Sequence, residues 1–316
     1  MPSNRHFRYD EERFDKLSGC ADPNSYEALR ARVIARYHVL EKGLTMPARK
    51  IGFGMSVASD LVDLLKSFEN KFGTDDGQIQ HAIGVLRTYY ELTRPHAESK
   101  DSIIVDANLW QKLIQFLDKH PSVGPAKQIH KTRLELYASK DAPFPAFAWS
   151  RRTIRNYTEE PIPDERIAAA VDLARSTPSS CNRQYCRVHC ISKKDQIQQL
   201  LSLQGGNRGF GHLADKILVV TSDLRCALHP QERTDAFVNG GMFLMNLSYS
   251  LFHEEIAHCI LNWSQTPKRD KELRSILRLE PAETVIAILS CGLAPSEVDI
   301  AASPRKPLVD ILAFAN

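Results

Sequence analysis

The chain has 316 residues, of which 43% are hydrophobic and 25% are charged, an ordinary composition for one or two globular domains. Its 41 Lys and Arg residues nearly balance 38 Asp and Glu residues, so we expect no nucleic-acid-binding arm and no polybasic membrane anchor. Seven cysteines without a CxxC pair argue against a disulfide framework. The polar start and the lack of any run of about 18 apolar residues predict no membrane span and a cytoplasmic location.

Apolar residues recur at helical spacing from Ser25 to about Tyr137, which predicts an all-helical first half. Ser25 and Ser56 are suited to cap helix N-termini, and Gly43 stands where a left-handed residue could end the first helix. The segment DAPFPAFA at 141–148 has two prolines and no periodicity, so it is the best candidate for a domain boundary.

Helical and strand patterns alternate after this boundary, which predicts a sheet covered by helices. We expect helices over 164–175, after Lys193 and over 234–253, and strands over 187–191, 216–221 and 284–289. The fold class is therefore α+β. It consists of a helical segment over residues 1–145, a candidate active-site cap, and a second domain over residues 146–316.

Three short polar motifs have residue types that could hold an anion or a planar heterocycle. Arg151-Arg-Thr-Ile-Arg155 offers guanidiniums and a hydroxyl that can bind a phosphate. Thr177-Pro-Ser-Ser-Cys-Asn-Arg-Gln184 offers both donors and acceptors, and ASPRKPL at 302–308 has a basic pair between prolines. Taken singly, each also fits a solvated basic face, a polar loop or a surface turn.

These motifs, in this order and with NGGMFLMNL at 239–247, resemble the nitroreductase superfamily over about residues 147–316. The resemblance implies a mixed sheet flanked by helices and a homodimer that binds FMN. It also implies that hydride passes from NADH or NADPH through the flavin to an electron-poor small-molecule acceptor. No metal is implied, and no catalytic residue is assigned because the flavin performs the redox chemistry.

The resemblance also assigns cofactor-binding residues. Arg151, Arg152, Thr153 and Arg155 would hold the FMN phosphate and the polar rim of the flavin, with Arg305 joining from the last motif. The residues that would meet the flavin ring or the ribityl chain are Pro178, Ser179, Ser180, Asn182 and Gln184, and the backbone at Ile260 and Leu261 would approach the ring.

One position departs from the family pattern. Asn207 and Arg208 stand about where relatives place an Asn and a Lys at the flavin pyrimidine, and Phe210 occupies the Lys position itself. Positive charge there would stabilise reduced flavin, so Arg208 is a candidate substitute. The missing Lys leaves an alternative open: a non-catalytic or specialised flavin-binding protein in a biosynthetic pathway, polysaccharide synthesis included.

Two histidine-containing segments have ordinary structural explanations. His253 and His258 frame a zinc-like HEEIAH segment, but on a helix they would point about 140° apart, so we expect no metal site. His38, Glu41 and Lys42 could line a pocket in the helical segment. Because His38 and Glu41 also form a common pair three residues apart, we favour a structural role for them.

Overall fold

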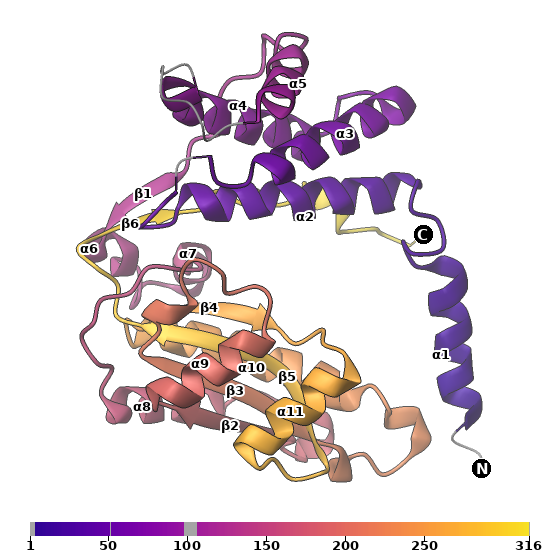
Figure 1. The fold of residues 1–316 in the computed structure, drawn as a ribbon. Coiled ribbons are helices and arrows are strands. Elements are labelled where there is room, and N and C mark those ends of the chain that lie inside the picture. The colour runs from indigo at the N-terminus through magenta and orange to yellow at the C-terminus, as the bar shows by residue number, and fades with distance from the viewer. Residues whose placement is uncertain (1–3, 51, 98–105, 316) are drawn as a thin grey trace. The chain divides into compact units, whose positions relative to one another are not determined.

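The computed structural model describes residues 4–50, 52–97 and 106–315. The chain divides into two compact units (Figure 1). The sheet unit consists mainly of residues 130–300, and the helical unit consists of residues 7–129 together with 301–316. The sequence placed the division at 145/146, and it did not separate the last residues from the second domain. Strand β1 (Ile129–Thr132) pairs with β6 (Glu297–Ile300), which attaches the residues after 129 to the sheet unit.

The helical unit is built around the expected periodic apolar residues. Its helices are α2 (Tyr26–Leu44), α3 (Met55–Phe72), α4 (Gly77–Ala97) and α5 (Ala107–Leu117), and α1 (Asn4–Leu17) comes before them. Helix α2 packs against α3 and α4, and α5 packs against α3. Leu40, Leu61 and Leu86 are fully buried in the core that these helices share. The helical prediction for this half of the chain is confirmed, except that Ile129–Thr132 form the short strand β1.

The helix ends in this unit agree only in part with the capping residues predicted from the sequence. Ser25 caps α2 as predicted, because its Oγ accepts a hydrogen bond from the Ala28 N–H at 3.4 Å. The prediction for Ser56 was wrong, since α3 begins one residue earlier, after the left-handed Gly54 (φ 67°). Gly43 does not end α2, which continues to Leu44. A glycine is required at position 43 because a Cβ there would overlap the Phe53 ring.

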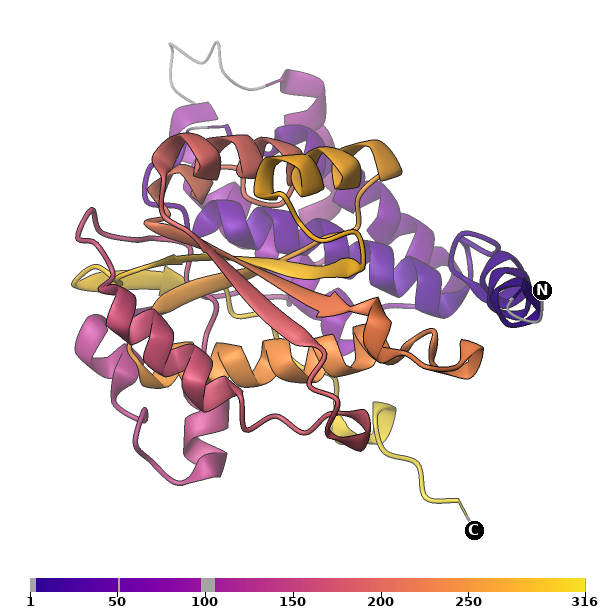
Figure 2. The ribbon, with the colours of Figure 1, turned by 90° about the horizontal axis from the view of Figure 1, so that it is seen from below.

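The sheet unit contains a four-stranded sheet in the order β2-β3-β5-β4. Its strands are β2 (Cys186–Ile191), β3 (Lys216–Asp223), β4 (Ala257–Asn262) and β5 (Glu283–Gly292). The helices of this unit are α6 (Arg133–Tyr137), α7 (Phe144–Ser150), α8 (Asp164–Ala174), α9 (Lys194–Leu203), α10 (Asp235–His253) and α11 (Pro267–Leu277). Figure 2 shows α8 and α10 on one face of the sheet and α9 and α11 on the other. The α+β class and the helix-covered sheet are confirmed.

The direction of the strands corrects one detail. The family resemblance implied a mixed sheet, whereas the β2–β3, β3–β5 and β4–β5 pairings are all antiparallel. Periodicity predicts that a strand exists but carries no information about its direction. Between β2 and β3, α9 and the loop after it return the chain to the end of the sheet that β2 has just left, so β3 runs opposite to β2.

Within the residues that the structure describes, every helix is too short or too polar to cross a membrane.

Glu41 is a fully buried charged residue of the helical unit. Its carboxylate is fully buried and lies 2.8 Å from His81 Nε2 and 3.6 Å from His38 Nδ1. Burial alone would raise the pKa of Glu41, but hydrogen bonds from His38, His81 and the Ser303 N–H lower it to about 2. The carboxylate is therefore ionised at neutral pH and acts only as an acceptor.

We predict that replacing Gly43 with Ala destabilises the helical unit by about 1–3 kcal/mol, because the new Cβ displaces the Phe53 ring. The better helix propensity of Ala offsets only about 1 kcal/mol of this cost. Urea unfolding of Gly43→Ala measures the loss, and the Phe53→Leu background should reduce it. An equal penalty in both backgrounds would contradict the packing explanation.

We also predict that acid weakens this unit through Glu41. Its pKa of about 2 lies below the ordinary value of 4.5, so the stabilisation is complete above pH 4.5 and is lost as the pH falls towards 2. Urea unfolding between pH 5 and 3 should show part of a total loss of about 3 kcal/mol in the wild type. Glu41→Gln should lack this part of the slope, and Glu69→Gln, which changes a carboxylate 3.5 Å from His120, should keep it. Parallel slopes for wild type and Glu41→Gln would exclude this role.

Candidate active site

The first motif, residues 151–155, lies against an edge strand of the sheet. The Arg151 N–H donates to the Phe147 carbonyl and closes α7, and the Ile154 N–H donates to the His258 carbonyl on β4 at 3.1 Å. Ile154 is buried, whereas Arg151, Arg152 and the other polar members of the motif are half-buried. The backbone of the motif is therefore fixed to β4, and several guanidiniums are grouped at the surface beside it.

His258 lies beneath this motif and is neutral. It is fully buried on β4, and its Nε2 is 2.7 Å from Ser248 Oγ. Burial, followed by the nearby Arg151 charge, lowers its pKa to about 4, against the raising effect of the Ile256 carbonyl. His253 ends α10 and His258 belongs to a strand, so the two do not share a helix. Within the described ranges no three His, Cys, Asp or Glu residues gather in a way that could hold a metal ion.

The second motif, residues 177–184, is a loop held by two asparagines of α10. Asn239 Oδ1 accepts from the Ser180 N–H at 2.9 Å, and Asn239 Nδ2 donates to Ser180 Oγ at 3.3 Å. Seven residues further along the helix, Asn246 Nδ2 donates to Thr177 Oγ1 at 2.8 Å. Asn239 is buried, and its Nδ2 also donates to the Asp235 carbonyl of its own helix at 2.7 Å. Helix α10 thus holds the loop at its first residue and at its middle.

The loop backbone is strained between these fixed points. Cys181, Asn182 and Gln184 all have left-handed φ angles, of 52°, 55° and 52°. Asparagine tolerates this conformation, but for Cys181 and Gln184 it costs about 1 kcal/mol or more, so the surrounding bonds must hold the loop in place. Ser179 contributes by accepting the Gln184 N–H at 2.8 Å through its Oγ. The side chains of Asn182 and Gln184 remain exposed.

Arg183 also holds the loop, and its role was not predicted from the sequence. Its guanidinium donates to both carboxylate oxygens of Glu232, at 2.8 and 3.0 Å, and to the Cys226 carbonyl at 2.6 Å. The bond to Glu232 lowers the pKa of that carboxyl to about 2. The pairing joins residues far apart in the chain, and short motifs reveal no such contact.

A hollow of about 170 Å³ opens between this loop and α10. It is lined by Arg175, Thr177, Pro178, Ser179, Gln184, Tyr185, Cys186, Asn239 and Phe243. Three of the predicted cofactor residues, Pro178, Ser179 and Gln184, therefore share one hollow with two side chains of α10. Its volume is below the roughly 300–1,000 Å³ of common ligand cavities. The hollow can therefore hold only part of a ligand and would form one side of a larger site.

The glycine-rich loop, residues 205–211, contains Asn207, Arg208 and Phe210. Asn207 Nδ2 donates to the Leu201 carbonyl at 2.7 Å and also to the Gln204 carbonyl, so this amide stabilises its own loop. Arg208 is exposed. Phe210 is fully buried, and the Arg155 guanidinium lies 6.0 Å from the centre of its ring. This contact brings the first motif and the glycine-rich loop together, and a hydrophobic side chain occupies the position expected for Lys.

The remaining predicted residues lie in two places. Ile260 and Leu261 are on β4, with Ile260 37% exposed and Leu261 buried. They follow His258, whose carbonyl is bound to the first motif. Arg305 belongs to the helical unit, where its guanidinium donates to the Ser303 carbonyl at 3.1 Å. Its part in a cofactor site stays a prediction.

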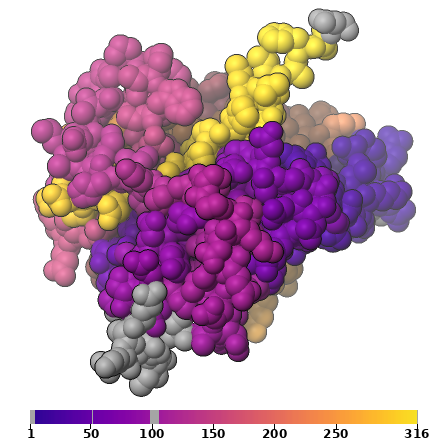
Figure 3. Space-filling view, turned by 90° about the horizontal axis from the view of Figure 1, so that it is seen from above, coloured from indigo at the N-terminus to yellow at the C-terminus, as the bar shows by residue number. Residues whose placement is uncertain are grey.

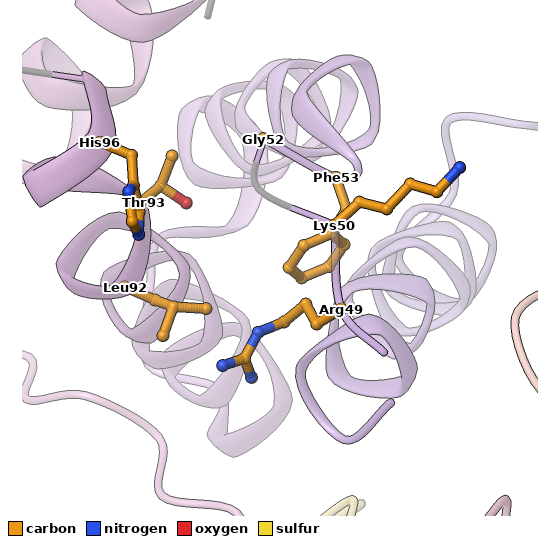
Figure 4. Close-up of a pocket in the computed structure, with 7 residues that line it drawn as sticks. All are labelled: Arg49, Lys50, Gly52, Phe53, Leu92, Thr93 and His96. Carbon is orange, nitrogen blue, oxygen red and sulfur yellow. The ribbon is translucent and has the colours of Figure 1, made fainter. Parts of the chain in front are cut away.

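A second hollow lies within the helical unit (Figure 4). It measures about 120 Å³ and is lined by Arg49, Lys50, Gly52, Phe53, Leu92, Thr93 and His96. The Arg49 guanidinium and the Phe53 ring point into it, and the Lys50 ammonium points away. None of the predicted cofactor residues contributes to this hollow.

Comparison with known proteins supports the sequence resemblance. Residues 148–208 match the Nitroreductase family. An FMN reductase [NAD(P)H] of Bacillus subtilis (strain 168) is 34% identical over 55 residues, which is 17% of this chain. The match spans only 22% of the length of that relative.

Solved structures of similar proteins include an FMN-dependent nitroreductase from Clostridium difficile R20291 and NfrA2 from B. megaterium. The first is 17% identical, with a TM-score of 0.45, and covers 54% of this chain and 98% of its own. The second is 18% identical, with a TM-score of 0.47, and covers 54% and 73%. The family match includes both the motif held by β4 and the loop held by α10. The chain thus resembles the nitroreductase family through residues 148–208, and a helical extension precedes this region.

Proposed function

We propose that the protein is an FMN-dependent oxidoreductase that transfers hydride from NADH or NADPH through the flavin to an electron-poor small molecule. The observation that carries this proposal is the family match over residues 148–208, which contains both structured motifs. The FMN reductase [NAD(P)H] relative supports the choice of cofactor and reductant. FMN, when bound, supplies the hydride chemistry, and the protein supplies binding and electrostatics.

The donor groups of the first motif fit the phosphate of FMN. Arg151, Arg152 and Arg155 offer guanidiniums, Thr153 offers a hydroxyl, and the backbone that carries them is fixed to β4. Guanidiniums bind phosphate oxygens in pairs through charge-assisted hydrogen bonds. The loop residues that would meet the flavin ring or the ribityl chain are Pro178, Ser179, Ser180, Asn182 and Gln184. The further candidates for cofactor binding are Ile260, Leu261, Asn207, Arg208 and Arg305.

A second candidate function follows from one residue. Phe210 is fully buried at the position where relatives carry a Lys, so that position supplies no charge to the flavin. A flavin binder without turnover, or one specialised for a single biosynthetic intermediate, would tolerate this change. The two candidates differ in whether NADH or NADPH reduces the bound flavin.

A homodimer is part of the proposal because α10 exposes a row of apolar side chains. Phe237, Val238, Met242 and Met245 are 58%, 56%, 41% and 38% exposed. They lie on the helix that also fixes the second motif, next to the incomplete hollow. A second copy could cover this row and supply further walls of the site. We place the protein in the cytoplasm, where its cysteines would remain reduced.

Replacing Arg152 with Ala should weaken FMN binding by about 1.5–3 kcal/mol, or roughly 10- to 150-fold, through loss of charge-assisted bonds to the phosphate. Quenching of FMN fluorescence on titration measures the dissociation constant. Arg36→Ala, which removes an exposed guanidinium of the helical unit, should bind FMN as the wild type does. An unchanged affinity in Arg152→Ala would refute the phosphate role.

Replacing Met242 with Arg should dissociate the dimer, because a charge in the apolar row would have to be buried against the second copy. Light scattering after size exclusion gives the mass of each variant. Leu134→Arg, which changes a side chain that is 83% exposed on α6, should remain dimeric. A wild-type protein that is monomeric at micromolar concentration would rule out the dimer.

A further inference from the structure

The hollow of the helical unit opens between the loop that joins α2 to α3 and the last turns of α4. The loop contributes Arg49, Lys50, Gly52 and Phe53, and α4 contributes Leu92, Thr93 and His96. All seven residues belong to the helical unit, whose surface is coloured indigo to purple in Figure 3. The hollow therefore lies within one unit and requires no particular arrangement of the two.

The charge of the lining has one sign. Among the described residues that line the hollow, Arg49, Lys50 and His96 are basic, and none is an Asp or a Glu. Figure 4 shows the Arg49 guanidinium entering from the loop, while the Lys50 ammonium points away. Arg49 Nη1 donates to the Leu44 carbonyl at 2.8 Å, which orients the guanidinium. A guanidinium has five N–H donors, and this bond uses one of them.

Helix α4 supplies polar groups from the opposite wall. Thr93 is only 3% exposed, yet it lines the hollow, and its hydroxyl is directed towards the loop (Figure 4). His96 lies three residues further along α4, on the same face of the helix. A guanidinium from the loop and a hydroxyl and an imidazole from α4 therefore surround one small space.

The apolar wall is held in place by the core. The Phe53 ring meets the Tyr89 ring edge-on, with the ring centroids 5.3 Å apart, and it also lies against Gly43, where a Cβ would overlap it. Tyr89 is fully buried. Gly52 has a left-handed φ of 71°, which glycine adopts freely. The hollow is therefore shaped by packing and backbone conformation.

We propose that this hollow is a second ligand site and that it binds the phosphate group of a small molecule. A guanidinium, an imidazole and a hydroxyl suit the several oxygens and the charge of a phosphate. A volume of about 120 Å³ has room for one such group but not for a ring system as large as a flavin. Because Arg49 and His96 are exposed, the rest of the ligand would extend into solvent.

The test is isothermal titration calorimetry of the FMN-loaded, full-length protein with inorganic phosphate and with glycerol 3-phosphate, at constant ionic strength. Bound FMN occupies the 151–155 motif, the other candidate phosphate site. We expect saturable binding of one phosphate or one glycerol 3-phosphate per chain. Tighter binding of the ester would point to an organic phosphate, and equal binding to the phosphate group alone. Acetate should bind at least tenfold more weakly, because a carboxylate has only two oxygens for the three donor groups.

Replacing Arg49 with Ala should weaken phosphate binding by at least tenfold, the loss expected for one charge-assisted bond. Lys50→Ala is the matched control, because it removes the neighbouring cation that points away from the hollow. It should bind phosphate within about threefold of the wild type.

Thr93→Val removes the hydroxyl but keeps the shape of the side chain, and it should weaken phosphate binding by about three- to tenfold. Thr93→Ser should restore the affinity. Urea unfolding checks the fold of each variant. If the lost bond to the Leu44 carbonyl prevents Arg49→Ala from folding, the comparison of Thr93→Val with Thr93→Ser decides the question.

Three results would overturn the inference. The first is wild-type protein that binds neither probe at millimolar concentration, and the second is equal binding of acetate. The third is a loss in Lys50→Ala as large as that in Arg49→Ala, which would indicate diffuse attraction to a basic loop. None of them affects the proposed function, which fails separately if the chain does not take up FMN. In that event the same titrations are made in the Arg152→Ala background, where the 151–155 motif has lost a guanidinium.

Discussion

The bonds from Asn239 and Asn246 to the 177–184 loop are the constraint on which the candidate site depends. Helix α10 lies on the sheet with Leu247 and Leu251 fully buried, so its position is set by the core of the sheet unit. Hydrogen bonds from the two asparagines hold a loop whose backbone is left-handed at three residues. Arg183 and Glu232 close the loop from the other side. These bonds together hold the polar loop rigid, and recognition of a planar ring requires a rigid binding surface.

The first motif is held rigid by different contacts. Its backbone is bound to β4, an edge strand, through the Ile154 N–H, and Arg155 packs over the buried Phe210 ring. The guanidiniums of this motif are thus held at the edge of the sheet. The third motif is attached to the helical unit, through a buried carboxylate of α2.

Sequence periodicity was sufficient for most helices and strands, because each amphipathic face repeats within a single element. Periodicity was insufficient where the role of a residue depends on a contact with a residue far away in the chain. Gly43 has the features of a helix terminus, but the Phe53 ring determines why it is a glycine. Glu41 and His38 form the expected local pair, yet the bond to Ser303, 262 residues away, is what distinguishes this carboxylate. The motif residues were found from their order, and the groups that hold them, Arg183 and Glu232, were not, because such pairing is visible only after folding.

In the proposed function, FMN bound by this chain accepts hydride from a reduced nicotinamide. The most direct measurement is the visible absorbance of the purified, FMN-loaded protein during anaerobic addition of NADH and, separately, NADPH. We expect the oxidised flavin band to bleach with at least one of them and to return when an electron-poor acceptor is added. Protein that binds FMN but keeps its yellow colour with both reductants would contradict the claim and favour a flavin-binding protein without turnover.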